Sequence, residues 1–183
     1  MKTPQTMPEL KETLLELSEK IVDLNEIMES ADPQTEPHKI KKAGTGLRHI
    51  GDDLLRYEKE TTGEDQAYVR FMLGSVCQLL DYHEKAVEMY RKALKVWPEH
   101  VGLLNELFIS LDALGLHEDA RIVVERSIRI GGETPDVLQN FAATLVKLDR
   151  IAEAKTVLFN CISKFPDDIE SQRFLRELDQ MKL

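Results

Sequence analysis

The chain has 183 residues, with 33 acidic side chains against 24 Lys and Arg and a formal net charge of −9. A nucleic-acid-binding protein needs surplus positive charge to displace counterions from phosphates, so this balance argues against nucleic acid as a partner. Gly and Pro are scarce, at nine and seven residues, and charged residues make up 31%. This mixture favours a helical protein of one domain, with or without an appendage.

Residues 1–60 are predicted to form two helices with heptad-like apolar stripes. The first begins with a Thr6 cap followed by Glu9, and the second begins near Pro37. Gly44 and Gly46 weaken the second helix by roughly 1 kcal/mol each, so tertiary packing must hold it. The two stripes, stepping by three and four residues, are Leu10, Leu14, Leu17, Ile21, Leu24 and Met28, then Ile40, Ala43, Leu47, Ile50, Leu54 and Tyr57.

The first stripe needs a partner surface, because six large apolar side chains are costly to leave in water. One possibility is a hairpin in which both helices pack on each other and on the next helix. Another is a homodimer through the Leu10–Met28 seam, and hairpins from two chains could also form a four-helix bundle.

The acidity of the chain is concentrated in the first helix. Residues 1–37 hold nine acidic side chains and three lysines. A basic surface is therefore expected beside this helix, and Lys39–Lys42 is the nearest candidate, with Glu26 and Glu29 across the turn.

A 34-residue period covers residues 67–168 without insertion, as 67–100, 101–134 and 135–168. Two apolar stripes recur in each unit, one at positions 4, 7, 8 and 11 and one at positions 20, 24, 27 and 28, which predicts two amphipathic helices facing each other. Thr134 and Pro135 supply a cap and a first-turn proline at the third unit.

Residues 169–183 are predicted to form a capping helix, since a stack of repeats leaves an apolar face open at its end. Asp167 with Glu170 resembles a capping box. The apolar stripe of this helix is Phe174, Leu175, Leu178 and Met181.

The repeat pattern resembles the tetratricopeptide repeat family, whose unit is a 34-residue helix–turn–helix. The resemblance implies an all-α fold: a right-handed α-solenoid of three repeats with an amino-terminal helical hairpin or coiled-coil segment and a carboxy-terminal capping helix. Three residues depart from the family pattern. Arg70 replaces a large apolar residue, Phe108 replaces Gly or Ala, and Gly132 replaces the final Pro.

The resemblance also implies a concave groove, lined mostly by the first helix of each repeat. Its apolar members could take side chains of a bound peptide or helical segment, and its amides could bond the peptide backbone. Tyr68 and Phe71 could instead pack against the amino-terminal helices. The implied groove residues are Tyr68, Phe71, Ser75, Gln78, Leu79, Asn105, Ile109, Asp112, Gln139, Ala143, Val146 and Lys147.

Some family members clamp the carboxylate terminus of heat-shock proteins with Lys, Asn and Arg side chains. The matching positions here hold no basic residue, which argues against that role. They are Phe71, Ser75, Glu106, Asp136 and Asn140.

We find no residue pattern for catalysis, a metal or a cofactor. His83 and His117 occupy the same repeat position and are expected to pack at turns, while Cys77 and Cys161 fall on core positions and are expected to be buried thiols. The sequence shows no secretion signal and no membrane span, which predicts a cytoplasmic protein.

The sequence thus predicts a non-catalytic protein–protein interaction adaptor or scaffold that needs no cofactor and does not insert into membranes. One alternative is a dedicated chaperone for a client protein, similar in repeat count and acidity to the acidic repeat chaperones of secretion systems. The other is an oligomerisation module that acts through the amino-terminal helices.

Overall fold

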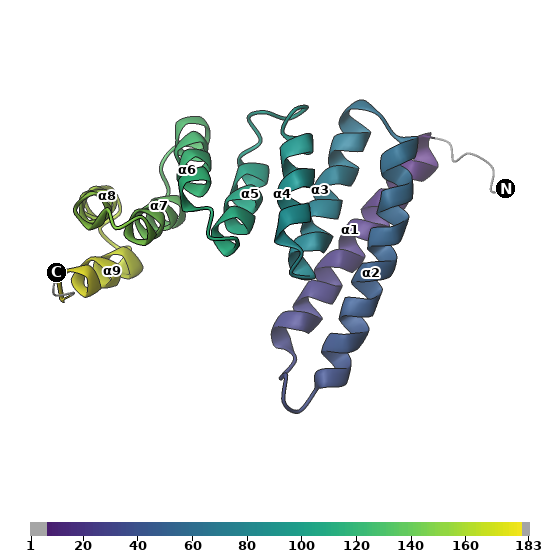
Figure 1. The fold of residues 1–183 in the computed structure, drawn as a ribbon, viewed down its shortest axis with the longest axis horizontal. Helices are drawn as coiled ribbons and strands as arrows, with labels where there is room; N and C mark the ends of the chain where they lie inside the picture. Colours follow the sequence, from purple (N-terminus) through teal and green to yellow (C-terminus); the bar gives the residue numbers. More distant parts are fainter. Residues whose placement is uncertain (1–6, 181–183) are drawn as a thin grey trace. The chain divides into compact units, whose positions relative to one another are not determined.

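The computed structural model describes residues 7–180, and all regular secondary structure in that range is helical. The chain forms two compact units that meet between Trp97 and Pro98. Unit 1 contains α1 (Met7–Ser30), α2 (Pro37–Glu60), α3 (Gly63–Leu79) and α4 (His83–Ala93) (Figure 1). Unit 2 contains α5 (Val101–Ala113), α6 (His117–Gly131), α7 (Pro135–Lys147), α8 (Ile151–Lys164) and α9 (Ile169–Gln180).

The boundary between the two units lies inside the predicted repeat array of residues 67–168. Helices α3 and α4 therefore share a compact unit with α1 and α2. Helices α1 and α2 pack against each other, and α2 also lies along α3. Two glycines of α2 face α3 and the residue that follows it at distances where a Cβ atom would make ordinary van der Waals contact. A Cβ atom on Gly51 would lie 3.4 Å from Val76, and one on Gly44 would lie 3.9 Å from Leu80.

The apolar stripe of α1 is buried inside unit 1. Leu10, Leu14, Leu17 and Ile21 belong to one cluster with residues of α2 and α3, while Leu24 and Met28 pack at its edge. The structure therefore has the hairpin arrangement, and these side chains are committed within one chain. A dimer through this seam would have to open that core. The predicted Thr6 cap lies outside the described residues.

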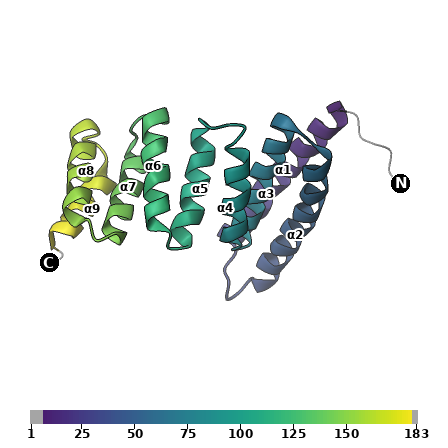
Figure 2. The same ribbon diagram turned by 45° about the horizontal axis from the view of Figure 1, so that its top comes forward.

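The 34-residue register is confirmed at most of its predicted core positions, although Cys77, Phe141, Ile128 and Ile162 are only half-buried. Positions 20, 24 and 27 are buried in all three pairs: Ala86, Tyr90 and Ala93; Ala120, Val124 and Ser127; Ala154, Leu158 and Cys161. Helices α5 to α8 lie alongside their sequence neighbours in unit 2 (Figure 2). Thr134 caps α7 as predicted, since its hydroxyl oxygen accepts a hydrogen bond from the Val137 backbone N–H at 3.4 Å.

The departures at Arg70 and Phe108 have structural reasons. Arg70 forms a half-buried ion pair with Glu58 of α2, 2.8 Å between Nη2 and Oε1, where an apolar side chain would lack that partner. Phe108 is buried, and its pair has the small Val124 at position 24, whereas the first pair combines Gly74 with Tyr90. Side-chain volume is thus exchanged between positions 8 and 24, which keeps the interior filled.

The turn inside each pair requires one residue in the left-handed region. That residue always occupies position 15: Asp81 at φ 64°, Gly115 at φ 71° and Asp149 at φ 59°. Asp tolerates this conformation better than most non-glycine residues. Gly132, at φ 84° and ψ −178°, ends α6 in a conformation essentially open to glycine alone. The family's final Pro is excluded there, because the pyrrolidine ring fixes φ near −65°.

Helix α9 covers the apolar end of α7 and α8. Leu178 is buried with Ala142, Leu145, Ala154 and Leu158, and Phe174 and Leu175 pack against them. The predicted cap at Asp167 is corrected: Asp168 caps this helix, its Oδ2 accepting the Ser171 backbone N–H at 3.1 Å. Met181 lies outside the described residues.

Candidate interaction surface

In unit 1 the predicted groove residues share one face of α3 but have different neighbours. Phe71, Ser75 and Gln78 gather around Tyr90 of α4. The Tyr90 hydroxyl donates to Gln78 Oε1 at 3.0 Å and lies 3.5 Å from Ser75 Oγ, and the Phe71 ring centroid is 6.2 Å from that of Tyr90. Tyr68 and Leu79 instead pack against the buried cluster shared with α1 and α2. Packing of Tyr68 against the amino-terminal helices stays a prediction, since this cluster also contains residues of α3 itself.

In unit 2 the structure brings two predicted residues into direct contact. Lys147 Nζ of α7 donates to Asp112 Oδ2 of α5 at 2.5 Å. Ile109 lies one turn from Asp112 on α5, and Ala143 lies one turn from Lys147 on α7. The ion pair therefore joins two helix faces that carry Ile109, which is 45% exposed, and the half-buried Ala143.

The amides predicted to bind a ligand are partly engaged within unit 2. Asn105 Oδ1 accepts a hydrogen bond from the Ser127 hydroxyl at 3.1 Å. Gln139 Nε2 donates to Asp168 Oδ2 at 2.9 Å and to Ser171 Oγ at 3.2 Å, which links α7 to the start of α9. The opposite end of each amide, Asn105 Nδ2 and Gln139 Oε1, has no hydrogen-bond partner among the described residues. Val146 packs toward the cluster shared with α9.

Comparison with known proteins identifies one of the three helical pairs as a known repeat. Residues 67–100, the first of the three pairs, match the family model of the tetratricopeptide repeat. Over 153 residues the chain is 25% identical to tetratricopeptide repeat protein 19, mitochondrial, of Mus musculus, covering 73% of this chain and 41% of that protein, and the protein of the same name from Rattus norvegicus gives the same figures. Residues 67–100 are thus identified as a tetratricopeptide repeat. The chain spans about two fifths of the length of these curated relatives.

Solved structures of helical repeat proteins share the fold of this chain. The crystal structure of Podosopora anserina putative kinesin light chain nearly identical TPR-like repeats has a TM-score of 0.70 at 14% identity, covering 91% of this chain and 87% of that one. The crystal structure of MamA has a TM-score of 0.62 at 16% identity, covering 92% and 99%. The first TPR of Spaghetti (RPAP3), bound to HSP90 peptide SRMEEVD, has a TM-score of 0.57 at 17% identity, covering 65% and 94%.

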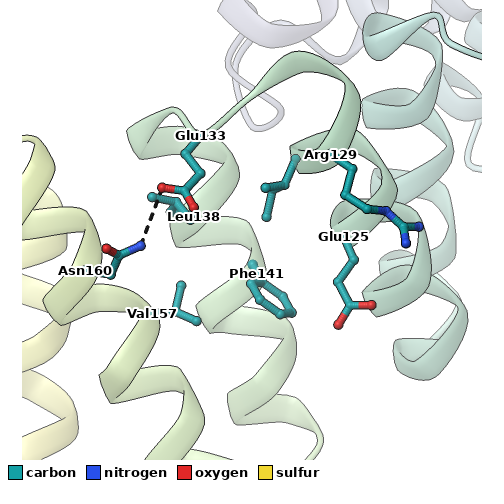
Figure 3. A pocket seen from close by; sticks show the side chains of 8 residues that line it. Glu125, Arg129, Glu133, Leu138, Phe141, Val157 and Asn160 are labelled. Atoms are coloured by element: carbon teal, nitrogen blue, oxygen red, sulfur yellow. Dashed lines mark hydrogen bonds between the residues drawn. The ribbon is translucent and has the colours of Figure 1, made fainter.

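Sequence reasoning missed a hollow of about 420 Å³ between α6, α7 and α8 of this repeat protein (Figure 3). Leu138 and Phe141 line it from the side of α7 opposite to Gln139, Ala143 and Lys147, given 3.6 residues per turn. Glu133 lies at its rim, where Asn160 Nδ2 donates to Oε2 at 3.4 Å and Lys164 forms an ion pair. The half-buried Phe141, at core position 7 of its repeat, was the available sequence signal.

The cysteines were expected in the core of the repeats and the histidines at their turns. Cys161 is buried, with its Sγ 3.2 Å from Ser171 Oγ, whereas Cys77 is only half-buried, which corrects its predicted burial. Burial raises the pKa of both thiols. His83 Nε2 lies 3.0 Å from Asp81 Oδ1, at the turn where packing was predicted. Within residues 7–180, no three His, Cys, Asp or Glu side chains are placed to hold a metal ion.

One His role was not predicted. His100 caps α5, because its Nδ1 accepts the Leu103 backbone N–H at 3.0 Å.

No helix in the described part of the chain combines the length and the apolar character needed to cross a membrane.

Proposed function

We propose that this protein is a non-catalytic interaction adaptor that holds a peptide or helical segment of a partner on the first helices of its repeats. The observation that carries the proposal is the joined surface of α5 and α7. The exposed apolar side chain of Ile109 lies one turn from Asp112 on α5, and an ion pair joins Asp112 to Lys147, one turn from Ala143 on α7. The tetratricopeptide repeat of RPAP3, a structural neighbour, is bound to a peptide, which supports this class of partner.

The surface is suited to binding because its polar side chains are already held in place. Asn105 and Gln139 are each fixed by an intrachain hydrogen bond, and each keeps one amide group for the backbone of a ligand. A surface fixed in this way orders the ligand and little of itself, which lowers the entropic cost of binding. The ligand would be read by its shape and backbone, with Ile109 and Ala143 receiving one or two apolar side chains.

The alternatives from the sequence have different support. An oligomerisation module acting through the Leu10–Met28 seam would need side chains that pack inside unit 1. The dedicated chaperone stays a prediction with no observation specific to it. The cytoplasmic location also stays a prediction, since the curated relatives carry the word mitochondrial in their name.

The proposal is tested by comparing Ile109→Asp with Ile122→Asp. Both isoleucines are exposed, at 45% and 54%, but Ile122 lies on α6. Proteins captured from a lysate by the wild-type chain are quantified for both variants, after circular dichroism shows unchanged helix content. We expect a set of partners that Ile109→Asp loses and Ile122→Asp keeps. Equal capture by the two folded variants would refute the surface.

A further inference from the structure

A second surface, separate from the repeats, lies at the tip of the α1–α2 hairpin. Residues 37–51 contain no acidic side chain, although 33 of the 183 residues in the chain are acidic. The same stretch carries three lysines, one arginine and two histidines. Such segregation in an acidic protein creates a local positive field that attracts acidic partners.

The structure arranges this positive charge around a groove on α2. Its volume is about 480 Å³, and it is lined by His38, Lys41, Lys42, Thr45, Gly46 and His49. These positions recur every three or four residues, so they form one stripe along the helix. Gly46 gives the groove its depth next to α1, since a Cβ atom there would lie 3.0 Å from Leu24.

No carboxylate within residues 7–180 forms an ion pair with the lysines of the groove. Glu26 and Glu29 were expected to lie near these lysines, but Glu29 accepts a hydrogen bond from Asn25, and the ion pair at this turn joins Lys39 to Glu36. The exposed Lys41 and Lys42 ammonium groups have no carboxylate partner among the described residues. A partner segment that carries carboxylates could pair with both ammonium groups.

An apolar notch adjoins the groove. It has a volume of about 350 Å³ and is lined by Leu24, Ile27, Ser30, Ala31, Glu36, Lys39, Lys42 and Ala43. Ile27 is 40% exposed there, and Lys42 lines both the notch and the groove. One ligand could therefore place an apolar side chain in the notch and carboxylates along the stripe.

The chemistry of this surface favours a protein segment over other anionic partners. The large apolar side chains of α2, including Leu47, Ile50 and Leu54, are buried in unit 1 and cannot enter a membrane. Duplex nucleic acid would meet the acidic side chains of α1 next to the stripe, where nine acidic residues oppose three lysines over residues 1–37. A short acidic segment avoids both difficulties, because it can follow the stripe alone.

We propose that the hairpin-tip surface, meaning the residues of the groove and the notch together, docks an acidic segment of a partner protein that carries an apolar side chain. The segment lies along α2 with carboxylates near Lys41, Lys42 and His49, and its apolar side chain contacts Ile27. This site does not depend on the repeat surface around Ile109, so the chain can hold two partners at once and act as a bridge between them.

The test uses the full chain and synthetic peptide probes. An amphipathic helical peptide of Glu, Ala and Leu is titrated by fluorescence anisotropy, beside the same peptide with Lys in place of Glu. The double variant Lys41→Glu/Lys42→Glu is compared with Lys59→Glu/Lys95→Glu. The control variant changes the net charge by the same four units, at two exposed lysines away from the groove. Ile27→Asp tests the notch, and Ile109→Asp shows whether the repeat surface takes part.

We expect the Glu peptide to bind and the Lys peptide not to bind. Reversing Lys41 and Lys42 should weaken binding at least tenfold and reduce its dependence on salt, Ile27→Asp should weaken it severalfold, and the two other variants should stay within twofold of the wild type. The proposal is overturned if the Glu peptide fails to bind at millimolar concentration or if Lys41→Glu/Lys42→Glu leaves its affinity unchanged. It is also overturned if phosphatidylserine vesicles or duplex DNA bind this surface more tightly than the peptide, or if sedimentation equilibrium shows that the surface is occupied by a second copy of the chain.

Discussion

Gly74 is the residue on which the packing of α3 against α4 depends most directly. A Cβ atom added there would lie 2.3 Å from Cε1, 2.6 Å from Cδ1 and 2.8 Å from Cζ of Tyr90. The Tyr90 side chain is fully buried and its hydroxyl is bonded to Gln78, so the ring cannot move aside without losing contacts. Gly74→Ala is therefore expected to destabilise unit 1.

Three contributions set the change in the free energy of unfolding of Gly74→Ala, two destabilising and one stabilising. Overpacking a filled interior costs about 1–3 kcal/mol, and losing the Tyr90–Gln78 hydrogen bond costs about 1 kcal/mol. Alanine recovers about 1 kcal/mol through its higher helix propensity. The free energy of unfolding should thus fall by about 1–3 kcal/mol, which corresponds to several degrees in Tm for a unit of this size.

Urea unfolding followed by the fluorescence of Trp97, the single tryptophan of the chain, reports on unit 1. Gly44→Ala is the matched control, because a Cβ atom there meets only Arg48 at 3.8 Å and Leu80 at 3.9 Å. This control should raise stability by about 0.5–1 kcal/mol through the propensity gain alone. Unchanged or increased stability in Gly74→Ala would refute the reasoning.

A double variant tests the cause. The third pair combines Ala142 with Leu158 at the positions that Gly74 and Tyr90 occupy in the first. Gly74→Ala/Tyr90→Leu should therefore be more stable than the sum of its single variants by at least about 1 kcal/mol. Additive effects would mean that the ring is not what resists the added methyl group.

Three further predictions concern other parts of the chain. Glu58→Gln should lower the stability of unit 1 by about 1 kcal/mol, and less at high salt, because it removes the charge opposite Arg70; urea unfolding at two salt concentrations measures this. Gly132→Ala should cost unit 2 about 1–3 kcal/mol in thermal unfolding, since φ is 84°, whereas Gly115→Asp should be tolerated because Asp occupies the same turn position in the other pairs; equal losses would contradict this. The Ser171 hydroxyl, the Gln139 amide and the backbone N–H groups of α9 lower the pKa of Asp168. The stabilising contribution of this carboxylate is therefore present above its unfolded-state pKa of about 3.9 and is lost as pH falls through the lower pKa of the folded state. Asp168→Asn should flatten the decline of unit 2 stability at acid pH, and an unchanged decline would disprove the effect.

The surface residues were predicted less well than the core, for a physical reason. A position on a helix gives the direction of a side chain but not its neighbours. Tyr68 and Phe71 are both predicted groove positions of α3, yet Tyr68 packs against the buried cluster shared by α1, α2 and α3, and Phe71 lies near Tyr90. Gln139 has a correct position on α7, but its amide is engaged by Asp168 and Ser171, about thirty residues along the chain.

The sequence by itself determined the helices and the buried positions 20, 24 and 27 of each pair, because the 34-residue period repeats an apolar pattern that two facing helices can bury. Only the tertiary structure decided what covers the Leu10–Met28 seam. A heptad stripe can pack equally on its own chain or on another, and here α2 and α3 supply the matching surface. The same holds for the net charge of −9: the sequence located the acidity in residues 1–37, but only the structure placed Lys41 and Lys42 at an exposed groove without a carboxylate partner among residues 7–180.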